Sequence, residues 1–327
     1  MATYKEINGT AVQNVAGDPS NPILGEVWYN SSTGAFKVAI EVAAGAWVTG
    51  GTMTRTGDKA IQLMGTGTQT ASIAFGGGGP TFTAATELYN GSSWTEVNDL
   101  NDGRRGGGRA GTSTSALCAG GFSPPSVTVT ELWNGTNWTE VNDMNNAREA
   151  MAGDGTQTSA LAIGGSPYGT SSNESWNGTN WTAVSNMNQG RYFLAASGAS
   201  NTSAIAIGGE PEPQGARTEL WNGSNWTEVN DLSDGARTGL AASHGSATAA
   251  LIFGAMKPSI GAAGAKTESW NGTNWSTKPS LNTARGYLAG SGTSTAALAF
   301  SGTTGSPTYV TEEFSSPGTA YRTITTT

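Results

Sequence analysis

The feature that most constrains this chain is one short motif that is written several times. WNGTNW begins at Trp133, Trp176 and Trp270, and the variant WNGSNW begins at Trp221. Asn-Gly is a strong signal for a two-residue β-hairpin loop, because a type I′ turn needs positive φ at both central positions. A catalytic motif is needed once, whereas a motif that recurs at a regular interval belongs to the architecture. The sequence therefore predicts a repeat protein built from hairpins.

Two further anchors fix the length of the repeat. A Gly-Gly pair, or a near equivalent, follows an apolar run six times, and a Glu-x-aromatic pattern follows each pair. The pairs begin at Gly76, Gly120, Gly164, Gly208, Gly254 and Ser301, and the glutamates are Glu87, Glu131, Glu174, Glu219, Glu268 and Glu312. A second Trp follows the aromatic residue at Trp94, Trp138, Trp181, Trp226 and Trp275, and the sixth copy has Tyr321 nearby. Successive glutamates are 43 to 49 residues apart, so six copies of one unit follow one another.

Each unit reads as four strands. SALAIGG at 159–165 alternates, with Leu161 and Ile163 on one face and alanines on the other. TELWN and NWTEV flank the Asn-Gly turn, and a stretch of small residues such as MAGDG at 151–155 supplies the remaining strand. Four antiparallel strands in about 40–50 residues are typical of a β-propeller blade. We expect an all-β fold with a six-bladed propeller over residues 55–327, in which each second Trp fills the gap against the next blade.

The order of these anchors resembles the kelch family: Gly-Gly after a strand, an aromatic residue, a Trp, and a basic residue that opens the next unit. The basic residues are Lys59, Arg104, Arg148, Arg191, Arg237 and Arg285. The resemblance implies a kelch-like six-bladed propeller and almost nothing about activity, because propellers host many functions. The recurring basic residues and glutamates are expected to form buried or half-buried ion pairs between blades, repeated to fix their registry. A charged ring that binds ligand is the alternative.

Two segments compete for the outer strand of the sixth blade. YRTITTT at 321–327 ends the last copy in register, so that six self-contained blades fit the sequence. GAWVTGG at 45–51 also reads as an outer strand, with Trp47 placed 12 residues before Lys59. The second segment could add to the closing blade or replace its last strand, and the sequence leaves both arrangements open.

Residues 1–54 do not share the repeat and are predicted to form a short N-terminal β arm. GEVWYNSSTGAF at 25–36 resembles the hairpins that open many bacteriophage fibre and virion-surface proteins. With the Gly-, Thr- and Asn-rich repeats behind it, the chain resembles a phage structural protein, which implies synthesis in the host cytoplasm and exposure on the particle. The apolar residues expected to attach the arm are Ile23, Leu24, Val27, Trp28, Phe36 and Trp47. So short an arm can scarcely bury them alone, and we expect it to bind other virion proteins or sister copies, a homotrimer being one arrangement.

Composition excludes several other classes of function. A net charge of -8 does not favour nucleic acid or an anionic membrane as a partner. No stretch approaches 18 apolar residues, so no membrane insertion is expected. The first residues, MATYKEINGT, lack the pattern of a signal peptide, and one cysteine cannot form a disulfide framework within the chain.

No enzymatic activity, cofactor or metal is expected. A kelch-type radical-copper oxidase needs several His and Tyr ligands and a Tyr–Cys crosslink, and zinc sites need comparable ligand sets. This chain has only His244 and Cys118. Cys118 is expected to be a small buried residue, and His244 to lie on the surface near a strand end. A six-bladed sialidase is disfavoured because its Asp-containing turn has a Trp here, and because the arginines recur at equivalent positions.

The segments between Gly-Gly and Glu-x-aromatic differ in length, charge and aromatic content, while the framework is almost copied. A rigid scaffold with divergent loops is a common way to build a binding surface, although neutral drift gives the same pattern. Aromatic rings and a few polar groups suit the recognition of a host glycan. The predicted binding residues are Phe82, Phe122, Tyr168, Glu210, Glu212 and Lys257.

These patterns favour a non-enzymatic phage tail fibre or adhesin that binds a host-surface glycan. A capsid decoration or head-fibre protein is the alternative within the virion. A cellular kelch propeller that binds carbohydrate or protein is the alternative from another class.

Overall fold

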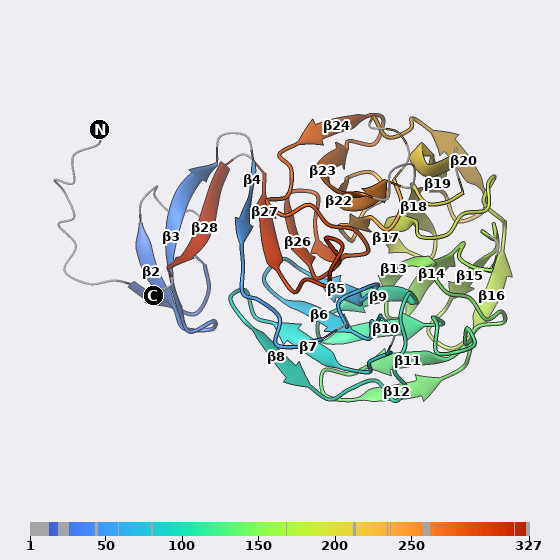
Figure 1. Cartoon of the computed structure of the whole chain (residues 1–327), viewed down its shortest axis with the longest axis horizontal. Coiled ribbons are helices and arrows are strands. Elements are labelled where there is room, and N and C mark those ends of the chain that lie inside the picture. The colour runs from blue at the N-terminus through green and yellow to red at the C-terminus, as the bar shows by residue number, and fades with distance from the viewer. Residues whose placement is uncertain are drawn as a thin grey trace.

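The fold is all-β, as predicted. The computed structural model describes residues 13–18, 26–42, 45–57, 59–79, 81–167, 169–211, 214–233, 235, 237–257, 262–316 and 318–324. These residues form seven four-stranded sheets, and the one helical element among them is a short 3-10 turn, η1 (Gln214–Ala216). Figure 1 shows six of the sheets arranged around a common centre and the seventh beside them. The arrangement is consistent with a multi-bladed β-propeller.

The first three repeat sheets are each built from four consecutive antiparallel strands. Repeat sheet 1 contains β5 (Met64–Gly67), β6 (Ser72–Phe75), β7 (Thr86–Tyr89) and β8 (Trp94–Val97). Repeat sheet 2 contains β9 (Gly108–Thr112), β10 (Ser115–Ala119), β11 (Thr130–Trp133) and β12 (Trp138–Val141). Repeat sheet 3 contains β13 (Ala152–Thr156), β14 (Ser159–Ile163), β15 (Asn173–Trp176) and β16 (Trp181–Val184).

The next two sheets repeat this order, and the sixth takes its outer strand from elsewhere in the chain. Repeat sheet 4 contains β17 (Ala195–Ser200), β18 (Ser203–Ile207), β19 (Thr218–Trp221) and β20 (Trp226–Val229). Repeat sheet 5 contains β21 (Ala241–Ala242), β22 (Ala250–Lys257), β23 (Ala262–Trp270) and β24 (Trp275–Lys278). Repeat sheet 6 contains β25 (Ala289–Gly292), β26 (Ala296–Phe300), β27 (Thr311–Ser315) and β4 (Ala46–Thr49). In repeat sheets 1 to 5 an Asn-Gly turn joins the third strand to the outer strand, whereas the outer strand of sheet 6 comes from an earlier part of the chain.

The first strands of the repeat sheets surround the centre. The strands β5, β9, β13, β17, β21 and β25 contact one another in that order, and β25 also contacts β5. Small residues make this convergence possible: a Cβ on Gly153 would lie 2.8 Å from the backbone nitrogen of Arg109 in the neighbouring strand. The small-residue stretches therefore form the first strands and allow these strands to approach one another around the centre.

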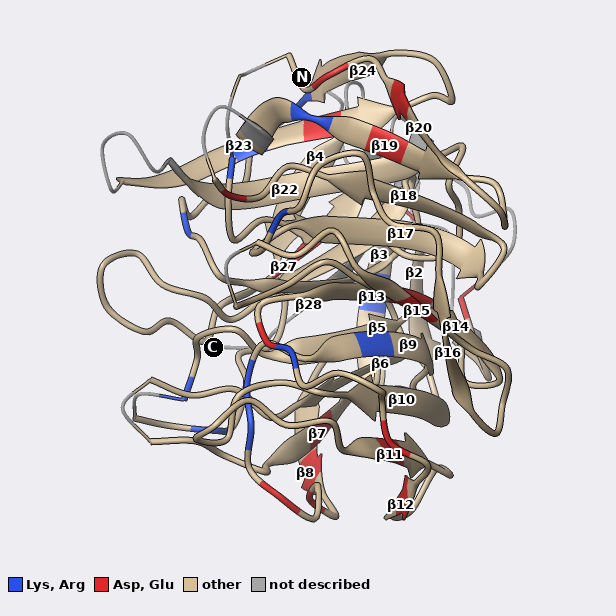
Figure 2. Ribbon diagram, turned by 90° about the vertical axis from the view of Figure 1, so that its right-hand side faces the viewer, with Lys and Arg blue, Asp and Glu red and all other residues tan. Residues whose placement is uncertain are grey.

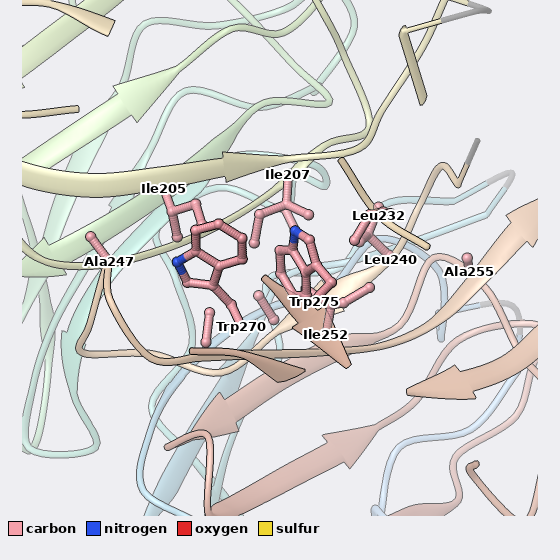
Figure 3. Close-up of a cluster of buried hydrophobic side chains, with 12 residues drawn as sticks. Ile205, Ile207, Leu232, Leu240, Ala247, Ile252, Ala255, Trp270 and Trp275 are labelled. Atoms are coloured by element: carbon pink, nitrogen blue, oxygen red, sulfur yellow. The ribbon is translucent and has the colours of Figure 1, made fainter. Parts of the chain in front are cut away.

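The recurring Trp residues hold neighbouring sheets together. The indole N–H of Trp138 in sheet 2 donates to the hydroxyl of Thr86 in sheet 1 at 3.1 Å, and Trp181 donates to Thr130 at 2.9 Å. The same bond joins Trp275 to Thr218, Trp47 to Thr267, and Trp94 to Thr311. In Figure 3, Trp270 and Trp275 of sheet 5 lie against Ile205 and Ile207 of sheet 4. The predicted packing of the second Trp between sheets is confirmed, but the sheet that it contacts is the preceding one in the chain and not the next.

The competition for the sixth outer strand is decided in favour of the earlier segment. Trp47 of β4 pairs with Phe314 of β27, and its ring packs against Phe253 of sheet 5. Residues 318–324 form β28, which pairs with β3 outside the repeat sheets. Of the two arrangements that the sequence left open, the one in which residues 45–51 supply the outer strand is therefore observed. The physical reason is that Trp47 supplies the indole that bonds to Thr267, as the second Trp residues of sheets 1, 2, 3 and 5 bond to a Thr of the neighbouring sheet.

Six buried arginine–glutamate pairs repeat around the structure. The pairs are Arg55–Glu87, Arg104–Glu131, Arg148–Glu174, Arg191–Glu219, Arg237–Glu268 and Arg285–Glu312. Each arginine lies in the segment that leads into a sheet and binds the glutamate of that sheet's third strand, so the pair ties the connection to the sheet. The predicted pairing is confirmed for five basic residues, but each pair joins a sheet to its own leading segment and not to another sheet. It is wrong for Lys59, because Arg55 lies four residues earlier and reaches Glu87 at 2.5 Å.

The seventh sheet, here called the arm sheet, contains β1 (Gln13–Val15), β2 (Val27–Asn30), β3 (Ala35–Val42) and β28 (Gly318–Ile324). Its strands alternate between a buried and an exposed face. Trp28 is 0% exposed and donates to Asp18, which also binds the ammonium of Lys37 at 3.0 Å. Val27 and Phe36 are 36% and 46% exposed. The arm sheet thus presents an apolar face to solvent.

Candidate binding face

One face of the repeat sheets carries all the divergent loops. Because neighbouring strands are antiparallel, the loop between the second and third strands and the connection to the next sheet emerge at the same edge. The Asn-Gly turns emerge at the opposite edge. We call the edge that carries the loops between second and third strands the loop face. Charged segments are sparse on the ribbon in Figure 2, and acidic ones lie on outer strands such as β8, β12 and β20.

The loops are anchored to the connections beside the centre. Phe122 forms an isolated bridge with Arg105, and Glu210 forms the equivalent bridge with Tyr192. Loops of sheets 3, 5 and 6 make the same contact through Ser166, Met256 and Thr303. The loop face is therefore a fixed backbone framework whose side chains differ from sheet to sheet.

Two of the predicted residues meet on this face. The rings of Phe82 and Phe122 lie 5.4 Å apart in an edge-to-face arrangement. The guanidinium of Arg105 lies 5.4 Å from the Phe82 ring and 5.5 Å from the Phe122 ring, and it donates to the carbonyl of Gly79 at 3.2 Å. All three side chains are half-buried. Sequence reasoning missed Arg105 because the adjacent Arg104 accounted for the recurring basic position.

Glu210 lies in a second cluster, which belongs to sheets 3 to 6. Its carboxylate accepts the Tyr192 hydroxyl at 2.7 Å, and this bond, with burial, raises the pKa of Tyr192 to about 12. The Tyr192 ring packs on Phe193 at 5.2 Å, and Phe193 packs edge-on against Tyr287 at 5.0 Å. These three aromatics follow recurring arginines at regular offsets, a signal that could have identified them.

The remaining predicted residues are not brought into either cluster. Tyr168 and Glu212 lie outside the described residues, as do Ile23 and Leu24 of the arm. Lys257 ends strand β22, and only its backbone is described. The predicted set therefore remains a prediction, of which Phe82, Phe122 and Glu210 have defined surroundings.

A ring of six residues surrounds the centre of the loop face, and we call it the axial ring. It consists of Gln62, Gly106, Ala150, Phe193, Gly239 and Tyr287, all with φ between 50° and 63°. Five of the six N–H groups donate to the carbonyl of a neighbouring member: Gly106 to Gln62, Gln62 to Tyr287, Tyr287 to Gly239, Gly239 to Phe193, and Phe193 to Ala150. In the sixth link the N–H of Met151, next to Ala150, donates to Gly106. The hydrogen bonds return to their starting point, so all six sheets are linked at this level.

A small pocket of about 60 Å³ opens inside the axial ring. Phe193, Tyr287 and Gln62 line it, together with leucine and methionine side chains and Arg109. Arg109 lies on β9, three residues further along the chain than Gly106. The pocket therefore combines aromatic walls with one cationic group.

His244 lies in the interior beneath this pocket. It is 7% exposed, and the prediction of a surface position is wrong because the imidazole fills the centre where the other first strands carry small residues. Its Nδ1 lies 2.7 Å from a carboxylate oxygen of the buried Asp154, and its Nε2 lies 3.3 Å from Nε of Arg109. The same Nε2 lies 3.2 Å from the carbonyl of Gly65 and 3.1 Å from that of Gly290, so this imidazole contacts the first strands of sheets 1, 2, 3 and 6.

The described residues offer few means of covalent or metal chemistry. Cys118 is fully buried as predicted, and burial raises its thiol pKa to about 11, so it is a poor nucleophile. Within the described part of the chain, no three His, Cys, Asp or Glu side chains gather in a group that could hold a metal ion. No helix in that part is long and apolar enough to cross a membrane.

No protein-family model matches the sequence, and no curated protein sequence matches it significantly. The functional assignment therefore rests on the geometry of the loop face.

Proposed function

We propose that this chain is a non-enzymatic binding protein, a six-bladed kelch-like β-propeller displayed on a bacteriophage virion as a tail fibre or adhesin. The observation that carries the proposal is the loop face, where a nearly copied framework holds six divergent loops. Repeating ion pairs and Trp–Thr bonds explain why the framework is copied. Only the loops are free to differ, and recognition surfaces are commonly built in this way.

The six-bladed count rests on two series of hydrogen bonds, the closed axial ring and five Trp–Thr bonds that link all neighbouring sheets except sheets 3 and 4. The axial ring links six consecutive sheets and returns to its start. The Trp–Thr bonds run in the same order, and the two that involve Trp47 and Thr311 join sheet 6 to its neighbours on both sides. A circuit of this kind favours six blades over an open stack of sheets.

The half-buried aromatics favour a glycan as the host-surface ligand. Sugar rings stack on aromatic faces, and a few polar groups fix their orientation. Phe82 and Phe122 offer apolar surface beside Arg105, and Tyr192 offers a hydroxyl beside Glu210. We expect different loops to contact different parts of one branched or extended glycan.

The arm sheet is the proposed attachment site. Val27 and Phe36 are the exposed large hydrophobic side chains of the described residues, and Phe36 packs on Tyr29 with ring centroids 5.1 Å apart. Trp28 and Trp47 are already buried within the chain, so the exposed face of β2 and β3 remains for a partner. The partner would be another virion protein or the arm of a sister copy, as in a homotrimer.

Adsorption of particles to host cells tests this function. Replacing Phe82 and Phe122 with Ala, and Glu210 with Gln, is expected to weaken adsorption at least tenfold while particle assembly is preserved. Replacing Thr136 and Thr179 of the opposite turns with Ala is the matched control. If the loop variants adsorb like the wild type, the adhesin role is wrong, and the mutual packing of Phe82, Phe122 and Arg105 then favours capsid decoration.

A further inference from the structure

The pocket inside the axial ring contains a cation that no carboxylate contacts directly, although Asp154 lies near enough to interact with it electrostatically. Six other buried arginines each bind a glutamate directly. Arg109 instead donates to Nε2 of His244 and, from Nη2, to the carbonyl of Ala242 at 3.4 Å. Among the described residues no acceptor bonds to its Nη1, and no carboxylate contacts the guanidinium. A partly buried guanidinium without a carboxylate is costly, so this site favours an anion from outside.

The carboxylate of Asp154, which lies beside His244, is bonded to groups other than Arg109. Asp154 accepts the backbone N–H groups of Gly155 and Gly198, each at 2.8 Å, in addition to its bond with His244. The Nε2 of His244 also lies 3.2 Å and 3.1 Å from the carbonyl oxygens of Gly65 and Gly290, so the imidazole is shared among several groups of the centre. Whichever ring nitrogen carries a proton, no carboxylate bonds directly to Arg109.

The pocket above Arg109 selects the kind of anion. A volume of about 60 Å³ accommodates a group of a few heavy atoms. The planar fork of a guanidinium matches the two oxygens of a carboxylate. Phe193 and Tyr287 form aromatic walls at the mouth, and the buried Oε1 of Gln62, which has no hydrogen-bond partner, can accept from a ligand hydroxyl.

We propose that the axial pocket is a carboxylate-binding site, in which Arg109 binds the carboxylate and Gln62, Phe193 and Tyr287 contact the body of the ligand. The ligand class is a small monocarboxylate, either free or as the acidic sugar of a glycan. Only the second source rests on the proposed function, since a free carboxylate would bind to the same groups without any role in adsorption.

NMR of the full chain, observing the side-chain Nε–H of Arg109, tests this site directly. Sodium glucuronate and sodium acetate are titrated as carboxylate probes, with glucose and sodium chloride as controls for the sugar body and for ionic strength. Both carboxylates are expected to shift the Arg109 resonance saturably, and the two controls are not. At least tenfold tighter binding of glucuronate than of acetate indicates an acidic sugar, and equal binding indicates free carboxylates.

The variant Arg109→Met is expected to lower the affinity for glucuronate by roughly ten- to a hundredfold. Arg217→Met, at an exposed ion pair on another sheet, is expected to leave it unchanged. Arg109→Lys, which keeps the charge but loses the fork, provides an intermediate value if the Met variant does not fold. The proposal is overturned if neither carboxylate shifts Arg109 more than sodium chloride does, or if Arg109→Met binds glucuronate like the wild type. Because the assay uses the isolated chain, a failure here is distinct from a failure of adsorption.

Discussion

Glu131→Ala is expected to be among the most destabilising single changes in the repeat framework. Glu131 and Arg104 are both fully buried, and the carboxylate accepts Arg104 Nη1 at 2.6 Å. Its second oxygen accepts the backbone and side-chain N–H groups of Asn101 at 2.9 and 2.6 Å. Removing one partner of a buried pair costs about 3–5 kcal/mol, because the other charge stays buried without compensation. The free energy of unfolding should fall by that amount in a urea titration followed by circular dichroism.

The exposed pair between Arg217 and Glu228 is the matched control. Its side chains are 30% and 48% exposed, so solvent screens the charges and Glu228→Ala should cost about 0–1 kcal/mol. The double variant Arg104→Met with Glu131→Met should be less destabilised than Glu131→Ala, since it buries no unpaired charge. If Glu131→Ala costs no more than Glu228→Ala, the reasoning about buried pairs in this framework is refuted.

Three further predictions follow from the other recurring contacts. Thr130→Val should cost about 1–3 kcal/mol of stability, because it leaves the Trp181 indole N–H without an acceptor. Trp226→Phe should cost less than Trp181→Phe, because the Trp226 N–H already has no acceptor, and thermal unfolding compares these three variants with the wild type. Trp47→Ala should cost about 3–5 kcal/mol, like loss of any buried Trp, and an unchanged midpoint would contradict its place in sheet 6. Glu210→Gln should lower the Tyr192 pKa from about 12 toward 10, measured by ultraviolet titration. Because that pKa is raised on folding, its stabilising effect is present below pH 10 and is lost as the pH rises toward 12, and a wild-type profile that is flat over this window would contradict it.

Much of the framework could be predicted because each unit repeats its anchors. The Asn-Gly turn, the second Trp and the glutamate recur with fixed spacing, and local chemistry explains each one. The outer strand of the sixth sheet was harder to predict, because residues 45–51 and 321–327 both have the pattern of an outer strand. Thr267 could have identified the correct segment. Equivalent Thr residues in other sheets accept a hydrogen bond from an indole, and of the two segments only residues 45–51 contain a Trp.

The candidate site was less predictable than the framework. Phe82 and Phe122 stood out as aromatics in divergent loops, but their contact with Arg105 depends on how two neighbouring sheets are placed. The cluster of Arg109, His244 and Asp154 comes from three sheets and has no sequence spacing in common. Such a site becomes visible only when the first strands are brought together around the centre.

Mass spectrometry and immunogold electron microscopy of density-purified particles test the central claim most directly. The particles are taken from the phage whose DNA encodes this chain, with a variant lacking the arm as the comparison. The account predicts that the wild-type chain copurifies with intact particles at a constant ratio, that gold labels the tail, and that the armless chain is lost from the particles. Absence of the chain from every purified preparation would contradict the virion assignment.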